Sequence, residues 1–151
     1  MFPGPIASVN TLLAPGVSIA QGLFIEMFLT MILIFTVLML AAEKSKDTFI
    51  APIGIGLALF VAEIAGKTGT MFLSYLTATY HSTGVYYTGG SLNPARSFGC
   101  AVAARSFPRY HWIYWLGPFM GSMFTAGYYR LIKLFNYEEA NPDQDSTGED
   151  F

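Results

Sequence analysis

The sequence predicts an all-α membrane protein with three transmembrane helices and one re-entrant half-helix. Of the 151 residues, 53% are hydrophobic and only 12% are charged, whereas soluble domains contain about 25% charged residues. Three apolar runs of 17 to 24 residues occupy 19–42, 50–66 and 112–134, and a short polar segment separates the first two. A further stretch, residues 94–105, begins like a helix but is too short to cross a bilayer.

The three apolar runs differ in how clearly they predict a spanning helix. Residues 19–42 form a run of 24 residues, which as a helix would be roughly 36 Å long, enough to cross a bilayer with some tilt. Residues 50–66 are at the short limit for spanning, and residues 112–134 begin with the aromatic side chains typical of a membrane interface. Small residues recur at helical spacing in the last two runs and predict close-packing faces: Gly54, Ala58, Ala62, Gly66, Gly117 and Gly121.

The residues at the N-terminal end of the segment 94–105 predict that it is a helix. Asn93 is a strong N-cap residue and Pro94 suits the first helical position. The 12 residues 94–105 would form a helix of roughly 18 Å, against a hydrocarbon core of ~30 Å. Such an element places its N-terminus near the middle of the bilayer, which is tolerated where the backbone is buried in protein or lines a wet cavity. That end carries about half a unit of positive charge.

The string Asn93-Pro94-Ala95-Arg96-Ser97-Phe98-Gly99 resembles the second signature loop of the aquaporin (major intrinsic protein) family, and the chain is most similar to fungal members. The resemblance covers most of the chain but corresponds to the second half of a family member. It implies the second of two inverted repeats, a passive water channel, no enzyme activity and no cofactor. It also implies a tetramer in a lipid bilayer. Independently of the resemblance, the sequence has no basic patch with interleaved aromatic residues, so a nucleic acid partner is not expected.

The resemblance implies a set of pore residues. Asn93 would donate its side-chain amide to passing water, and Arg96 would form the selectivity constriction, a costly charge at membrane depth. Glu63 stands where water channels carry a histidine, and Gly90 matches another constriction position. The change from histidine to glutamate adds an acceptor beside Arg96, which could narrow or gate the pore or alter its solute preference. Pro94 and Ala95 complete the signature.

Supporting and marker residues follow from the same resemblance. Glu26 would accept hydrogen bonds from backbone N–H groups of the signature loop and hold its turn. Water-type and glycerol-type members differ at marker positions, four of which carry the water-type residue here: Ser97, Ala101, Tyr114 and Trp115. Water is therefore expected as the solute in preference to glycerol.

Three further segments complete the predicted organisation. Residues 1–18 resemble the external loop between the two halves of a family member. Residues 67–84 interrupt a helix that is continuous in the family, and are interpreted either as a loop on the external side or, preferably, as a retained intron. Residues 138–151 hold six of the ten acidic residues and no basic one, and are predicted to be a disordered acidic tail.

Basic residues predict the orientation. Four lie at one predicted side, Lys44, Lys46, Arg130 and Lys133, against Arg105 and Arg109 at the other, which places the C-terminus in the cytoplasm. A single cysteine, Cys100, excludes an intrachain disulfide and makes a metal site improbable.

Two hypotheses remain open at this stage. The chain is part of a passive channel for water, or for another small neutral solute such as glycerol. Alternatively it is a non-conducting membrane fragment or an assembly partner, because the pore of the family needs one signature loop from each of two repeats.

Overall fold

The computed structural model describes residues 10–43, 46–67 and 87–135, and the regular structure of this part is helical throughout. Helix α1 (Ile19–Val37) continues into a π-helical turn, η2 (Leu38–Ala42), and a 3-10 turn, η3 (Lys46–Ile50), leads into α2 (Ala51–Lys67). The short α4 (Pro94–Ala104) and the long α5 (Ile113–Leu134) follow. The expectations for residues 1–9, 68–86 and 136–151 lie outside the described residues.

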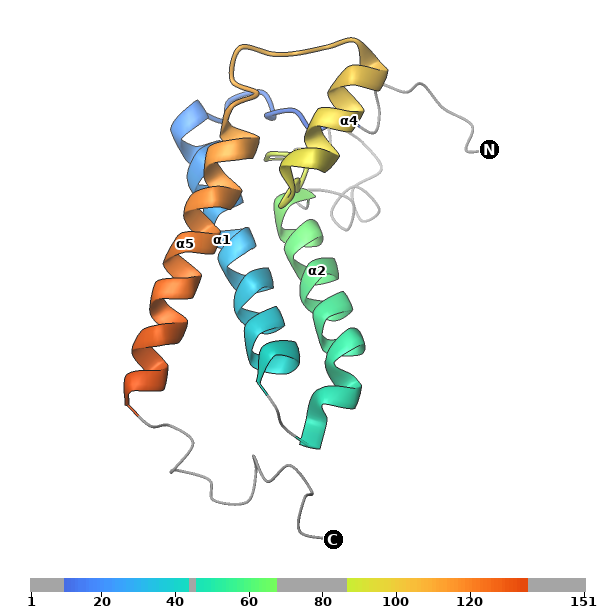
Figure 1. Cartoon of the computed structure of the whole chain (residues 1–151). Coiled ribbons are helices and arrows are strands. Elements are labelled where there is room, and N and C mark those ends of the chain that lie inside the picture. Colours follow the sequence, from blue (N-terminus) through green and yellow to red (C-terminus); the bar gives the residue numbers. More distant parts are fainter. Residues whose placement is uncertain (1–9, 44–45, 68–86, 136–151) are drawn as a thin grey trace, which may run out of the picture.

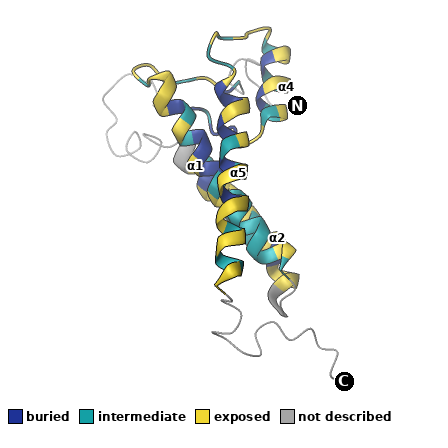
Figure 2. Ribbon diagram, turned by 60° about the vertical axis from the view of Figure 1, so that its left-hand side comes forward, coloured by how far each residue is buried: buried dark blue, intermediate teal, exposed yellow. Residues whose placement is uncertain are grey.

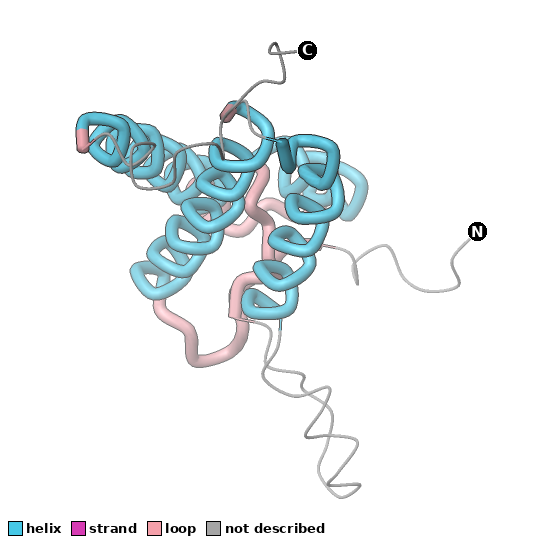
Figure 3. Tube along the Cα trace, turned by 90° about the horizontal axis from the view of Figure 1, so that it is seen from below, coloured by secondary structure: helices cyan, strands magenta, loops and turns pink. Residues whose placement is uncertain are grey.

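Three long helices lie side by side, with α1 between α2 and α5 (Figure 1). The short α4 lies at the end of the bundle where α1 and α5 begin and α2 ends (Figure 1). The end-on view shows the loop before α4 running through the space that the helices enclose (Figure 3). This arrangement brings residues 88–93, which precede α4 and are called the signature loop from here on, into contact with the long helices.

The all-helical prediction is confirmed for the described residues, whereas the prediction of three membrane spans is not settled by length and composition. Among these residues, the helix over Ile19–Ala42 is long and apolar enough to cross a bilayer, with a mean hydropathy of 2.5. A shorter apolar helix covers Thr48–Ile64. The short helix ends one residue before its predicted end, because Arg105 adopts a left-handed conformation with φ of 50°.

Burial is concentrated at one end of the bundle. The fully buried residues come from the segment before α1, from α1, from the C-terminal part of α2, from the loop before α4, and from α4 and α5 (Figure 2). Large apolar side chains cover the outer helix faces instead; for example, Phe28 is 55% and Phe124 is 56% exposed. An exposed apolar surface of this extent is typical of an interaction with lipid or with another protein.

Two glycines of α5 allow it to approach α1 closely. A Cβ atom at Gly117 would lie 2.9 Å from the Cβ atom of Glu26, and one at Gly121 would lie 2.5 Å from the carbonyl oxygen of Met27. Thr125, one turn further along, donates to the carbonyl oxygen of Gly121 over 2.9 Å and also contacts that of Met31 over 3.3 Å. This crossing fixes α1 against α5 beside the signature loop.

Candidate pore-lining site

Asn93 begins α4 and caps it. Its backbone is extended (φ −144°, ψ 117°), and its side-chain oxygen accepts a hydrogen bond from the N–H group of Ala95 over 2.9 Å. Pro94 occupies the first helical position, where its missing N–H group costs nothing. Because the oxygen of the Asn93 amide is engaged by the helix, the amide nitrogen is the end of the side chain available to a solute.

The loop before α4 has an unusual backbone. Gly89, Gly90 and Leu92 all have positive φ angles, of 83°, 57° and 52°. The left-handed conformation is unfavourable for a leucine by roughly 1–2 kcal/mol, so other contacts must hold this turn. The N–H group of Gly90 donates to the Thr88 hydroxyl over 3.2 Å, which satisfies one donor inside the turn.

Glu26 supplies the main support of this loop. Its side chain comes from α1 and is completely buried. One carboxylate oxygen accepts from the N–H group of Ser91 over 3.0 Å and the other from that of Leu92 over 2.8 Å. Two buried backbone donors are thus satisfied by one buried carboxylate, and each would be costly if left unpaired.

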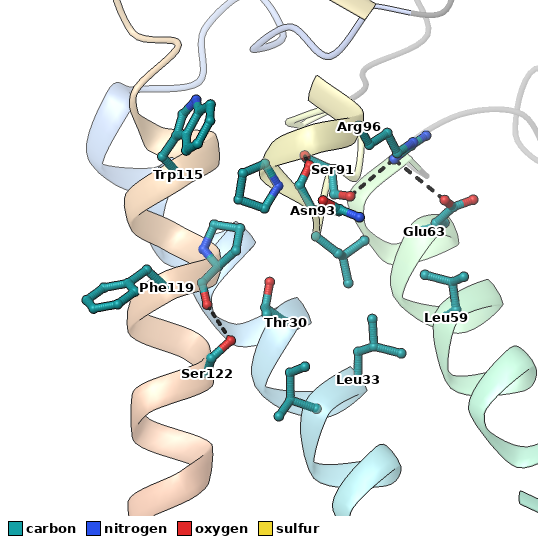
Figure 4. Close-up of a pocket in the computed structure, with 14 residues that line it drawn as sticks. Thr30, Leu33, Leu59, Glu63, Ser91, Asn93, Arg96, Trp115, Phe119 and Ser122 are labelled. Atoms are coloured by element: carbon teal, nitrogen blue, oxygen red, sulfur yellow. Dashed lines mark hydrogen bonds and ion pairs between the residues drawn. The ribbon is translucent and has the colours of Figure 1, made fainter. Parts of the chain in front are cut away.

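Arg96 and Glu63 form an ion pair between α4 and α2. The guanidinium Nη1 lies 3.5 Å from Oε1 of Glu63, and both side chains are about one-third exposed, at 31% and 34%. The same nitrogen also donates to the carbonyl oxygen of Gly90 and, over 3.4 Å, to that of Ser91. Arg96 is therefore held along the wall of the site by two carbonyl groups and one carboxylate; Figure 4 shows the contacts with Ser91 and Glu63.

Gly90 fits tightly between these elements. A Cβ atom there would lie 3.4 Å from both the Cα atom and the carbonyl oxygen of Glu63. The loop backbone can therefore lie directly against the last turns of α2, which brings Glu63 within reach of Arg96. The positive φ of 57° also favours glycine at this position.

Asn93, Arg96 and Glu63 line an open cavity of about 610 Å³ between α1, α2, α4 and α5 (Figure 4), whereas Gly90 and Glu26 are not among its lining residues. Its polar wall carries Ser91, Asn93, Arg96 and Glu63, and its other walls are largely apolar. Glu63 and Arg96 are the two charged residues among those that line it, so their charges cancel. The remaining lining residues are Thr30, Leu33, Ile34, Leu59, Leu92, Pro94, Trp115, Pro118, Phe119 and Ser122.

The four marker residues occupy different surroundings. Trp115 lines the cavity, whereas Ser97, Ala101 and Tyr114 are completely buried and lie behind its wall. The Tyr114 hydroxyl donates to the carbonyl oxygen of Thr88 over 2.8 Å and so holds the start of the signature loop. Ala95, next to Asn93, is exposed and contributes its N–H group to the cap.

Several contacts were not foreseen from the sequence. Thr11, in the segment before α1, donates to the Ser97 hydroxyl over 2.6 Å, and Ser91 donates to the Asn93 carbonyl oxygen over 2.9 Å. The one sequence signal for these contacts was the presence of hydroxyl residues near the signature loop. Thr11 lies 86 positions from Ser97, and no local pattern joins two residues so distant.

Comparison with known proteins identifies the family of the chain. The family described as "Major intrinsic protein" matches residues 5–72 and 64–129. "Probable aquaporin-3" of Gibberella zeae is 59% identical over 97% of this chain, which covers 45% of that protein. "Aquaporin-7" and "Aquaporin-2" of Botryotinia fuckeliana are 55% and 52% identical over 97% and 99% of the chain, which covers 28% and 35% of their lengths.

The chain thus spans less than half the length of these curated relatives. The match nevertheless extends over most of its own residues, including all four described helices except the end of α5. The predicted resemblance, including its fungal character, is therefore confirmed, and the chain belongs to the major intrinsic protein family.

Proposed function

We propose that this chain forms one half of a passive membrane channel for water, with Asn93 and Arg96 on the path of the solute. The observation that supports this most strongly is the cavity in which the free amide of Asn93 lies next to the Arg96 guanidinium, opposite apolar walls. Family membership supports a channel for water or small solutes.

The arrangement suits a solute that exchanges hydrogen bonds with water at little cost. Asn93 offers a donor at the end of α4, and the apolar walls do not compete for the solute. The positive end of the α4 dipole raises the energy of a cation at this point. Pore diameter, hydrogen-bond donors and half-helix dipoles are the general means by which such channels select.

Glu63 bears on which solute passes. Its carboxylate neutralises Arg96, so that the constriction presents a donor and an acceptor side by side with no net charge. Neutral solutes that both donate and accept hydrogen bonds are favoured by such a pair. Water fits this description, and the residues at positions 97, 101, 114 and 115 favour water over glycerol.

The described part of the chain does not fully enclose the cavity. In the proposed channel a second repeat of opposite orientation completes the enclosure. We further propose that α1 with η2, α2 and α5 span the membrane, with Lys133 and the C-terminus on the cytoplasmic side, and that the complete protein forms a tetramer. The alternative proposal is that the chain alone is a non-conducting fragment or assembly partner.

A fusion protein tests both proposals. In it, this chain replaces the matching region of the probable aquaporin-3 of Gibberella zeae, and stopped-flow light scattering measures the shrinkage of vesicles that contain it. We expect water permeability well above that of empty vesicles for the fusion, and none above them for the 151-residue chain alone. Faster passage of glycerol than of water through the fusion would contradict the proposed solute.

A further inference from the structure

Three buried hydroxyl groups link the segment before α1 to the start of α4. The Thr11 hydroxyl donates to the Ser97 hydroxyl over 2.6 Å, and the Ser97 and Ser91 hydroxyl oxygens are in hydrogen-bond contact. Ser91 in turn donates to the carbonyl oxygen of Asn93 over 2.9 Å. None of the three side chains is more than 2% exposed, so bulk water has little access to these bonds.

The chemistry of these groups fixes the direction of the chain. A carbonyl oxygen only accepts hydrogen bonds, so the Ser91 hydroxyl donates its single proton to the Asn93 carbonyl oxygen. The Ser91 oxygen must then accept from Ser97, and the Ser97 oxygen accepts from Thr11. Every proton of the three hydroxyls is used once, and all of them point toward Asn93.

The chain ends at the residue that the proposed channel requires. The Asn93 carbonyl oxygen accepts a hydrogen bond from the Ser91 hydroxyl and a second one, over 3.3 Å, from the N–H group of Ser97. The Asn93 side-chain oxygen accepts a hydrogen bond from the N–H group of Ala95. These three bonds hold both the backbone and the side chain of Asn93 and direct its free amide nitrogen to the cavity.

Thr11 is itself held in place by its neighbours. The N–H group of Ala14 donates to the carbonyl oxygen of Tyr87 over 3.1 Å, and that of Leu13 donates to the Tyr110 hydroxyl over 3.3 Å. Gly89 has no side chain between it and this segment, and a Cβ atom there would lie only 3.0 Å from the Cα atom of Thr11. The segment thus presents the Thr11 hydroxyl to Ser97 from a fixed support.

We propose that Thr11 is a positioning residue for Asn93, acting through Ser97 and Ser91, and this inference rests on the proposed channel function. Without the Thr11 proton, the Ser97 oxygen loses its donor, and the remaining two hydroxyls can reorient. The Asn93 cap then samples other arrangements, and its amide leaves the geometry that favours passing water.

Three substitutions in the fusion protein test this role. Thr11→Val removes the hydroxyl while keeping the shape, and Thr11→Ser keeps the hydroxyl. Thr125→Val is the matched control, because Thr125 is equally buried, at 2% exposed, but bonds between α5 and α1. Hydrogen–deuterium exchange over residues 93–97 reports on the cap, and stopped-flow measurements report on water permeability per folded channel.

We expect Thr11→Val to speed exchange over residues 93–97 by roughly 3- to 10-fold, the factor for the loss of one hydrogen bond, and to lower water permeability at least ~3-fold. Thr11→Ser should restore both, and Thr125→Val should change neither, even if it lowers the melting temperature. Unchanged exchange in Thr11→Val, or equal effects of Thr125→Val, would overturn the inference. A parent fusion that folds but conducts no water would refute the proposed function, and the exchange comparison would still decide on the hydroxyl chain.

Discussion

At the scale of single residues, the signature loop depends on polar side chains that are buried behind it. Glu26 satisfies two backbone donors, and Tyr114 holds the carbonyl group of Thr88. The sequence allowed Glu26 to be predicted as the support because of its place in an apolar run and the family resemblance. The hydroxyl chain from Thr11 could not be predicted, since it depends on how distant segments pack.

Glu26→Gln tests the support directly. A glutamine offers one oxygen where the carboxylate offers two, so either Ser91 or Leu92 loses its acceptor and faces an amide N–H group. We expect a loss of roughly 1–3 kcal/mol in stability and a lower water permeability in the fusion protein, measured by thermal unfolding and stopped flow.

Glu43→Gln serves as the control for Glu26→Gln. Glu43 also bridges two elements, since it accepts from Lys133 over 2.8 Å and from Tyr129, but it lies at the opposite end of the bundle. This variant should lower stability without a comparable loss of permeability. A Glu26→Gln protein with unchanged stability and permeability would show that the loop does not need the carboxylate.

His111 gives the loop before α5 a dependence on pH. Its ring packs against Phe107 and Tyr114, with centroid distances of 5.4 and 5.8 Å, and neither ring nitrogen has a hydrogen-bond partner among the residues that the structure describes. Burial lowers the pKa of His111 below its usual value of 6.5, so the unfolded chain binds a proton more readily than the folded one. The contribution of His111 to the free energy of unfolding is therefore complete above pH 6.5. It is lost as the pH falls from 6.5 toward the lowered pKa of the folded protein.

The measurement is the melting temperature of the fusion protein between pH 7.5 and pH 5. We expect it to fall on acidification, with a loss from His111 of at most about 1.4 kcal/mol per pH unit. His111→Phe keeps a ring between Phe107 and Tyr114 and should reduce this dependence. If His111→Phe leaves the pH dependence unchanged, other groups are responsible for it.

At the scale of helices, local signals predicted most of the architecture. The Asn93-Pro94 pair marks the start of α4, and the long apolar runs coincide with α1 plus η2, with α2 and with α5 to within one residue at each end. The π-helical turn at Leu38–Ala42 and the 3-10 turn at Lys46–Ile50 were not foreseen. Both lie where the chain reverses between α1 and α2, and there packing decides the conformation more than local propensity does.

The α1–α5 crossing yields a prediction with an internal control. Gly121→Ala places a Cβ atom 2.5 Å from the Met27 carbonyl oxygen, so the helices must separate, at a cost of roughly 1–3 kcal/mol. Gly127→Ala, on the same helix, meets no atom of the described part of the chain within 4 Å and should be neutral or slightly stabilising. Thermal unfolding of the two variants compares them; equal melting temperatures would show that the crossing can relax freely.

At the scale of the whole molecule, the chain returns to the end of α2 after the segment that resembles an insertion. Gly90 lies against the backbone of Glu63, although 26 residues separate them in sequence. The family resemblance interprets residues 67–84 as an interruption of a continuous helix, by an external loop or by a retained intron, and this interpretation stays a prediction. Deleting residues 67–84 from the fusion protein is expected to maintain or raise its melting temperature and its water permeability.

Two results would contradict this prediction. One is a deletion variant that no longer folds, which would mean that the segment contributes to the packing around the signature loop. The other is a mature transcript that contains the codons for residues 67–84, which would exclude the interpretation as a retained intron. Sequencing of the transcript and thermal unfolding of the variant therefore address the same segment independently.

The central claim is that water passes through the cavity beside Asn93 and Arg96. Ser122 lines this cavity from α5, so a mercurial reagent bound to a cysteine there should block the path. The measurement uses a fusion protein in which all other cysteines, including Cys100, are changed to serine. Gly127→Cys, on the same helix but away from the cavity lining, is the control.

Stopped-flow water permeability before and after treatment with the reagent decides the claim. We predict that the reagent reduces the permeability of the Ser122→Cys channel nearly to that of empty vesicles and leaves the Gly127→Cys channel unaffected. Full permeability of a Ser122→Cys channel that mass spectrometry shows to be labelled would place the water path elsewhere and contradict the account.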